Sequence, residues 1–243
     1  PNRSKMINYL ANPNRFMKLV SPFEKFLGIV SICLISTGLY FALLNSPEDY
    51  QQGETVRIMY IHVPCAWFAS FLYLGVSLTS IAFLIWKHPF ADIVARSIAP
   101  LGLIFSILTL ITGSLWGKPT WGTWWVWDAR LTSMLILCIF YAAYIGISNA
   151  FPRKSDGSKP AAILAIIGLI NLPIIKFSVD WWKTLHQPSS IFKIDGPSID
   201  DSMLIPLTIM LLAFLFISSY VIIMNIKTNL VIKKYHSEKI KLD

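Results

Sequence analysis

The chain has 243 residues, of which 55% are hydrophobic and only 14% are charged, and its formal net charge is +8. Soluble domains carry about 25% charged residues, so this composition excludes an ordinary soluble domain, a disordered chain and a disulfide-rich secreted domain. The three cysteines lie in or beside apolar runs and form no C-x-x-C pair. They therefore indicate neither a disulfide framework nor a thiolate metal site.

Six segments are apolar over about the 20 residues that a helix needs to cross a bilayer. In chain order they are 26–46, 63–86, 97–117, 131–150, 161–179 and 202–226. The fifth is the weakest, because it contains Asn171, Pro173 and Lys176. The runs alternate too weakly for barrel strands. We therefore predict an all-α polytopic membrane protein with six transmembrane helices, forming one integral membrane domain over 1–243.

Lysine and arginine are distributed unequally between the two sides that six spans define. Fifteen lie on the side of the termini and six on the other side. Because loops rich in these residues stay inside, we expect both termini in the cytoplasm or matrix and the loops 47–62, 118–130 and 177–201 outside. This distribution explains the net charge without nucleic acid as a partner. Residues 1–25 are polar and basic, so we expect the first span, rather than a cleavable signal, to direct insertion.

The second outer segment, 116–130, is unusually rich in tryptophan. Five of the nine tryptophans lie in it: Trp116, Trp121, Trp124, Trp125 and Trp127. If the segment forms a short interfacial helix, Trp121, Trp124, Trp125 and Asp128 share one face. Such a platform is suited to stacking against a large flat ring system. An aromatic belt at the bilayer interface is the alternative interpretation.

Two of the four histidines, His62 and His186, are expected on the same outer side as the tryptophan segment. Two imidazoles from separate segments can bind a metal from opposite faces, and imidazole suits iron, copper and zinc. No neighbouring cysteine or third histidine completes a zinc set, so the aromatic segment favours haem over a bare ion. His88 and His236 lie on the inner side and are interpreted as ordinary interfacial or solvated residues.

Haem carries two propionates, which call for arginine or lysine at the rim of the site. Arg57 precedes His62 by five residues, and Arg130 follows Asp128 by two. Each arginine is either a propionate partner or an ordinary loop charge. Asp128 has three possible roles: a helix cap, a partner of Arg130, or an acceptor that fixes the tautomer of a histidine.

The stretch Trp121-Gly-Thr-Trp-Trp-Val-Trp-Asp128 matches the tryptophan-rich "WWD" signature, W-G-x-x-W-x-W-D, of haem-handling membrane proteins. Together with RIMYIHVP and WWKTLHQP, it resembles the haem exporter protein C family, also called cytochrome c maturation protein C, over nearly the whole chain. The resemblance implies that His62 and His186 are the axial ligands of haem b, which is bound as cargo. It also implies that the signature is a haem platform, with Trp121, Trp124, Trp125, Trp127 and Asp128 in it. The other predicted haem contacts, chosen from their positions in the sequence, are Trp116, Arg57 and Arg130.

The resemblance also implies a function in c-type cytochrome biogenesis, at the bacterial inner membrane or the equivalent membrane of some mitochondria. Members of the family hold haem at the outer, periplasmic face and deliver it to a haem chaperone, protein E of the maturation system. Their other partners are a small membrane subunit, protein D, and an ABC transporter of proteins A and B. This chain has no P-loop, so we expect ATP hydrolysis from the transporter and no enzyme activity from the chain itself.

Two other classes of membrane protein are the alternatives to this function. A haem-b membrane oxidoreductase needs histidine pairs inside helices, usually on both sides of the membrane, whereas the candidate pair here lies on one side. A small-solute transporter places charges and broken helices near the midplane, often in repeated halves. Five of the six spans have no charged residue, and no internal repeat is visible.

Overall fold

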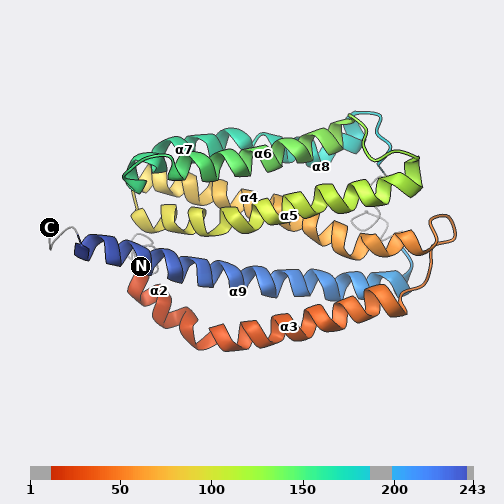
Figure 1. The fold of residues 1–243 in the computed structure, drawn as a ribbon, viewed down its shortest axis with the longest axis horizontal. Coiled ribbons are helices and arrows are strands. Elements are labelled where there is room, and N and C mark those ends of the chain that lie inside the picture. Colours follow the sequence, from red (N-terminus) through yellow and green to blue (C-terminus); the bar gives the residue numbers. More distant parts are fainter. Residues whose placement is uncertain (1–11, 187–198, 240–243) are drawn as a thin grey trace, which may run out of the picture.

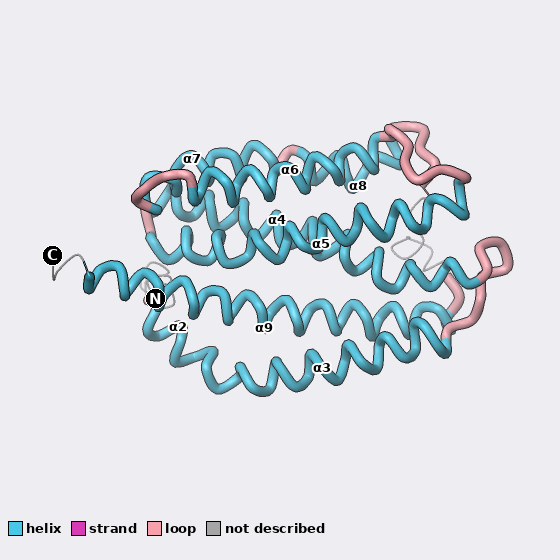
Figure 2. Tube along the Cα trace, in the orientation of Figure 1, coloured by secondary structure: helices cyan, strands magenta, loops and turns pink. Residues whose placement is uncertain are grey.

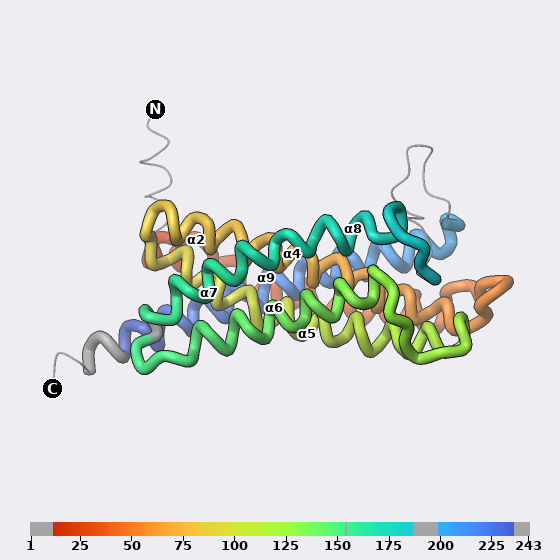
Figure 3. The backbone as a smooth tube through the Cα atoms, turned by 90° about the horizontal axis from the view of Figure 1, so that it is seen from above, coloured from red at the N-terminus to blue at the C-terminus, as the bar shows by residue number. Residues whose placement is uncertain are grey.

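In the computed structural model, the described residues, 12–186 and 199–239, are almost entirely helical and contain no β-strand. Within them, six helical stretches are long and apolar enough to cross a membrane. The helices lie lengthwise beside one another in an elongated bundle (Figures 1 and 3). The predicted all-α, polytopic architecture is therefore confirmed. Residues 187–198, a part of the third outer loop, lie outside the described residues.

Six spans are assembled from more than six helical pieces. In chain order the pieces are α2 (Pro13–Val20), the 3-10 turn η1 (Ser21–Phe23), α3 (Glu24–Tyr40), the π-helical turn η2 (Phe41–Asn45), the 3-10 helix η3 (Glu54–Ile58), α4 (Met59–Trp86), α5 (Pro89–Trp121), α6 (Ala129–Asn149), α7 (Lys154–Gly168), α8 (Asn171–Trp181) and α9 (Asp201–Lys239). The first span combines α2 to η2, and the fifth combines α7 with α8.

Several helices extend beyond the apolar runs that predicted them. α4 begins at Met59 instead of 63, so His62 lies inside the helix and not in the loop before it, and Pro64 is an internal residue of the helix. α5 continues to Trp121 instead of 117, and α9 continues to Lys239 instead of 226. Hydropathy marks only the apolar part of a helix, whereas backbone hydrogen bonding continues through polar flanking residues.

The fifth span, predicted as the weakest of the six, contains a break between two helices. α7 ends at Gly168, and α8 begins two residues after the turn at Leu169. Pro173 lies in the first turn of α8, where its missing N–H costs no helical hydrogen bond. The buried Asn171 donates from Nδ2 to the carbonyl oxygen of Ser133 on α6, at 2.8 Å. The polar residues that lowered the hydropathy therefore start a second helix and attach it to α6.

The bundle has two packed groups of helices. α4, α5, α6 and the α7–α8 pair pack together, while α3 packs along α9, which in turn lies on α4 and α5 (Figure 1). Buried tyrosines fill the centre of the first group, among them Tyr73, Tyr141 and Tyr144. The hydroxyl of Tyr141 donates to the carbonyl oxygen of Ala69 at 2.7 Å. A polar group at the centre of the core is thus paired within the protein.

Loops gather at both ends of the bundle, and the two ends differ (Figure 2). One end, called the outer end below, carries the connections 46–53, 122–128 and 182–186. The opposite, inner end carries the start of α2, the end of α9 and the short turns at 87–88 and 150–153. This arrangement places the described parts of the three segments predicted as outer loops at one end of the bundle.

A buried ion pair fastens three helices at the inner end. Arg96 Nε lies 2.9 Å from Asp92 Oδ2, and the two side chains are only 12% and 17% exposed. Arg96 also donates from Nη1 to the carbonyl oxygen of Ser148, at 2.6 Å. Its Nη2 donates to Ser158 Oγ, at 3.0 Å. One guanidinium thereby joins α5 to the C-terminal end of α6 and to α7.

Substitution of Arg96 by alanine is expected to destabilise the protein strongly, because the largely buried Asp92 loses its counter-charge and keeps only the hydrogen bond from Ser158. Breaking a buried pair typically costs about 3–5 kcal/mol. The matched control is Arg153→Ala, which breaks an ion pair with Asp156 whose side chains are 82% and 41% exposed. An exposed pair contributes about 0–1 kcal/mol. The Tm of both variants is measured by thermal unfolding in detergent, with size-exclusion chromatography as the readout. Equal losses of Tm would contradict the role of Arg96.

Candidate functional site

The structure brings His62 and His186 together at the outer end of the bundle, although they are far apart in the sequence. Their ring centroids are 6.4 Å apart, and the ring planes are inclined by 30°. His62 belongs to the first turns of α4, and His186 lies in the segment that follows α8. The predicted convergence of two imidazoles from separate segments is therefore present in the fold.

His62 is packed closely against α5 and is only 8% exposed. Its Nδ1 lies 3.0 Å from Thr112 Oγ1. A Cβ atom built on Gly113 would lie 3.0 Å from His62 Cε1, so the ring occupies space that a larger residue would fill. The edge-on ring of Trp116, with its centroid 5.7 Å away, packs against His62 as well. Three residues of one helix therefore fix the position of this imidazole.

His186 is partly exposed, and its surroundings come from other helices. The indole of Trp121, at the end of α5, has its centroid 6.1 Å from the His186 ring. Arg130 of α6 lies with Nη1 3.4 Å from His186 Nδ1. Arg130 therefore lies beside His186, while its predicted role as a propionate partner stays a prediction.

Arg130 is held in place by the last turns of α8. Its Nε donates to Ser178 Oγ at 3.2 Å, and its Nη2 donates to the carbonyl oxygens of Ile175 and Lys176, both at 3.3 Å. A backbone carbonyl oxygen has two lone pairs, so it can accept from the guanidinium as well as from the helix. Arg130 thus connects α6 to α8 and fixes the segment from which His186 projects.

The tryptophan segment is not the short interfacial helix that its spacing suggested. α5 runs through Trp121 and ends at Gly122, which has a φ of +77°, a left-handed conformation that glycine adopts without strain. Residues 122–128 are irregular. Ser114 Oγ on α5 donates to the carbonyl oxygen of Trp124, at 2.8 Å, and holds the segment back against the helix. The prediction of one helical face was wrong because Gly122 stops the helix before the motif is complete.

The five tryptophans are consequently distributed over different surfaces. Trp116 and Trp121, on α5, approach the histidines. Trp125 is half-buried, while Trp124 and Trp127 are 53% and 77% exposed. Trp125 and Trp127 meet edge to face, with centroids 5.4 Å apart. The segment therefore offers two indoles to the histidines and exposes two others at the surface.

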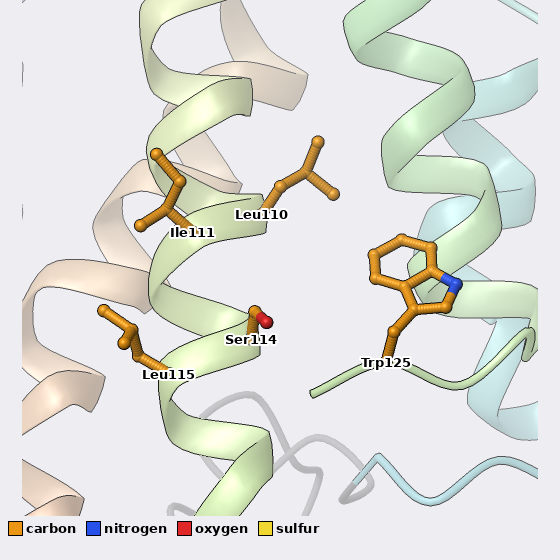
Figure 4. A pocket seen from close by; sticks show the side chains of 5 residues that line it. All are labelled: Leu110, Ile111, Ser114, Leu115 and Trp125. Atoms are coloured by element: carbon orange, nitrogen blue, oxygen red, sulfur yellow. The ribbon is translucent and has the colours of Figure 1, made fainter. Parts of the chain in front are cut away.

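Two shallow grooves flank the tryptophan segment. One has a volume of ≈ 370 Å³ and is lined by Leu110, Ile111, Ser114, Leu115 and Trp125. In this groove the indole of Trp125 faces α5 (Figure 4). The other has a volume of ≈ 350 Å³ and is lined by Val126, Trp127, Asp128, Lys183, Thr184 and Leu185. Neither histidine lines either groove. The grooves are therefore separate from the space between the imidazoles.

Asp128 takes the first of the three roles considered for it. It is the N-cap of α6, where its Oδ1 accepts a hydrogen bond from the backbone N–H of Leu131 at 2.8 Å. Its other oxygen, Oδ2, is buried and has no partner among the described residues, and the same holds for Trp125 Nε1. Buried polar atoms are normally paired, so these two atoms of the WWD segment have unused hydrogen-bonding capacity.

Arg57 fastens a different part of the outer end. Its Nη1 donates to the carbonyl oxygen of Leu43 at 2.7 Å and forms an ion pair with Glu54, also at 2.7 Å. Its Nη2 donates to the carbonyl oxygen of Ser46 at 3.2 Å. These contacts join η3 to the end of the first span. A role for Arg57 in ligand binding stays a prediction.

Sequence reasoning did not identify three residues that shape the site: Thr112, Gly113 and Gln52. Gln52 Oε1, in the first outer connection, accepts a hydrogen bond from Trp116 Nε1 at 2.7 Å. Thr112 and Gly113 lie within the apolar run that marks α5. A signal was available there, because Thr112-Gly113-Ser114 interrupts that run with small and polar residues.

Fold and site together define a polytopic membrane protein with two imidazoles and a tryptophan-rich segment at one end of its bundle. The model of one protein family, described as "Heme exporter protein C", matches residues 6–241. The chain belongs to this family.

Individual relatives agree with this assignment. The heme exporter protein C of Bradyrhizobium diazoefficiens is 50% identical over 205 residues, which cover 84% of this chain and 78% of the relative. That of Escherichia coli K12 is 39% identical over 223 residues, covering 92% and 90%. A ccmC-like mitochondrial protein of cytochrome c biosynthesis from Marchantia polymorpha is 44% identical over 199 residues, covering 81% and 84%.

Replacement of Gly113 by valine is expected to lower stability and to displace the His62 ring, because the new side chain requires the same space. Overpacking a close contact typically costs about 1–3 kcal/mol. Gly146→Val on α6 is the matched control, since a Cβ atom there meets nothing within 4 Å. The Tm of the two variants in detergent measures the difference; a Gly113→Val variant as stable as Gly146→Val would show that the close approach is not constraining.

Proposed function

We propose that this protein is a haem-binding component of c-type cytochrome biogenesis, which holds haem b as cargo at the outer face of the membrane and delivers it to the haem chaperone, protein E of the maturation system. The observation that carries the proposal is the pair of imidazole rings of His62 and His186, whose centroids are 6.4 Å apart. The names of the relatives, heme exporter protein C and a cytochrome c biosynthesis protein, support it.

The spacing of the two rings suits a shared metal ion. A metal–imidazole bond is about 2.0 Å long, and the centre of the ring lies about 1 Å beyond the nitrogen. Two imidazoles on opposite sides of one ion therefore have centroids about 6 Å apart. The 6.4 Å between His62 and His186 agrees with this value.

The donor set favours haem over a bare ion. Among the described residues, no group of three or more His, Cys, Asp or Glu is arranged to hold a metal. A bare zinc ion requires three or four protein ligands. The iron of haem already has four ring nitrogens and requires only two axial ligands, which is the number of imidazoles here.

The cations beside His186 and along the tryptophan segment are suited to an anionic ligand. Arg130 adjoins His186 directly, and Lys183 lines the groove beside Trp127. Lys118 lies with its Nζ 5.9 Å from the centroid of the Trp124 ring. Guanidinium groups bind carboxylates through paired hydrogen bonds, so we assign the propionates to this group of cations. The indoles of Trp116 and Trp121 supply apolar ring surface beside the imidazoles.

The unequal distribution of lysine and arginine supports an orientation with both termini in the cytoplasm and the histidines on the periplasmic side of a bacterial inner membrane. In this orientation the bound haem faces the compartment in which c-type cytochromes are completed. We assign the chain a delivery role without turnover of a substrate. Its proposed partners are the small protein D and the ABC transporter proteins A and B, which supply ATP hydrolysis.

His62→Ala and His186→Ala are each expected to abolish the six-coordinate, low-spin haem spectrum, because each removes one axial ligand. His88→Ala, at the inner end, is the control and is expected to retain it. Absorption spectra of the oxidised and dithionite-reduced protein, with a pyridine haemochrome count, measure the result. Retention of the bis-histidine spectrum in either outer variant would refute the proposed ligands.

Trp124→Ala and Trp125→Ala are expected to reduce haem transfer to the chaperone several-fold, since a lost aromatic contact costs about 0.5–1.5 kcal/mol. Trp86, on α4, is a matched control, with an exposure of 63% against 53% for Trp124. Trp67, inside the same helix, is a second control. Haem transfer is measured as the amount of haem bound covalently to the chaperone. Equal losses in all four variants would favour the aromatic-belt interpretation of the segment.

A further inference from the structure

The two imidazoles differ in the hydrogen bonds that their Nδ1 atoms make. Thr112 donates its hydroxyl proton to the carbonyl oxygen of Leu108, at 2.6 Å. A hydroxyl has one proton, so Thr112 Oγ1 is left to act as an acceptor toward His62 Nδ1, 3.0 Å away. The ring nitrogen facing α5 is therefore the one that carries the proton.

With its proton on Nδ1, His62 has its lone pair on Nε2. This is the tautomer that binds a metal through Nε2, and an acceptor at Nδ1–H both fixes the orientation of the ring and strengthens its nitrogen as a donor. Thr112 supplies this acceptor from a rigid helix. His62 is thus prepared for ligation without any change in its hydrogen bonds.

His186 has the opposite arrangement. Arg130 Nη1 lies 3.4 Å from His186 Nδ1. A guanidinium has donors only, so Nδ1 of His186 is the acceptor and the proton of the neutral ring lies on Nε2. Binding a metal through either nitrogen then changes the contact with Arg130. Ligation through Nδ1 displaces the guanidinium, and ligation through Nε2 moves the proton to Nδ1, where it opposes the donor.

We propose that Thr112 is a positioning residue that makes His62 the axial ligand that stays bound to the iron, and that the Arg130 contact makes His186 the ligand that dissociates when haem is passed on. This inference rests on the proposed haem function and deepens it. The burial of the rings agrees with it: His62 is 8% exposed between α4 and α5, whereas His186 is partly exposed in a connection. When the iron leaves His186, Arg130 Nη1 can again donate a hydrogen bond to His186 Nδ1.

The first experiment measures haem loss from the full chain in nanodiscs to excess apomyoglobin. Thr112→Val keeps the shape of the side chain but removes the acceptor, and loss of such a partner typically weakens metal binding about 10–100-fold. We expect haem loss to accelerate about tenfold or more in Thr112→Val and to return close to the original rate in Thr112→Ser. Thr109→Val is the matched control, because that buried hydroxyl donates only to the carbonyl oxygen of Phe105, at 2.8 Å.

The second experiment identifies the affected ligand by resonance Raman spectroscopy. Carbon monoxide is bound to the ferrous protein and then removed by a light pulse, which leaves a five-coordinate iron with one histidine. We expect the iron–histidine stretching band to be that of the His186→Ala variant, in which only His62 remains. Thr112→Val is expected to lower its frequency, since Nδ1–H loses its acceptor, whereas the band in His62→Ala should not respond to Thr112→Val.

The outcomes separate this inference from the function on which it rests. If the unsubstituted protein binds no haem, the proposed function fails. If it binds haem but Thr112→Val loses it no faster than Thr109→Val does, the role of Thr112 is refuted. A transient band that matches that of His62→Ala would reverse the assignment, with His186 as the ligand that stays bound and His62 as the one that dissociates. Because the light-pulse measurement needs only the unsubstituted protein and Thr112→Val, it decides the question even if a histidine variant fails to bind haem.

Discussion

The outer end of the molecule depends on one close approach, between the first turns of α4 and the stretch of α5 around Gly113. An imidazole ring fits between two packed helices only where one of them lacks a side chain, and Gly113 provides that gap. The same stretch of α5 supplies Thr112 on one side and Trp116 one turn further on. Once α5 is fixed there, its last turn carries Trp121 to the second histidine.

The two halves of the site belong to different pairs of helices. His62 is positioned by α4 and α5, which meet along much of their length. His186 is positioned by α6 and α8, through the guanidinium of Arg130 and the carbonyl groups of Ile175 and Lys176 on α8. The separation between the imidazoles is therefore set by the packing of α5 against α6. A change in that packing alters the distance between the rings without touching either of them.

Hydropathy predicted the spans well, because the cost of placing polar backbone in lipid leaves helices as the only fitting structure for long apolar runs. The fourth span, predicted at 131–150, is α6, Ala129–Asn149. The same signal could not place the end of α5, since Lys118 and Pro119 look like loop residues although they continue the helix. His62 and His186 were singled out because the expected topology placed both on the same side as the tryptophan segment.

The neighbours of the histidines were harder to predict, for reasons that lie in the residues themselves. Thr112 stands in an apolar run and satisfies its own hydroxyl within the helix, so nothing in its spacing separates it from a structural threonine. Arg130 was identified, but its attachment to α8 depends on a break in the fifth span that composition registers only as weak hydropathy. The irregular WWD segment follows from the left-handed conformation of Gly122, which periodicity alone does not reveal.

The length of α9 has a mechanical consequence. At about 1.5 Å per residue, its 39 residues form a rod about 58 Å long, whereas the hydrocarbon core of a bilayer is about 30 Å thick. Its C-terminal turns extend past the neighbouring helices at the inner end (Figure 1). Near the opposite end of this rod, Leu207 and Met210 pack with Tyr60 beneath Trp116. A tilt of the C-terminal turns of α9 would therefore reach this cluster, and through Trp116 the neighbourhood of His62, along a single helix.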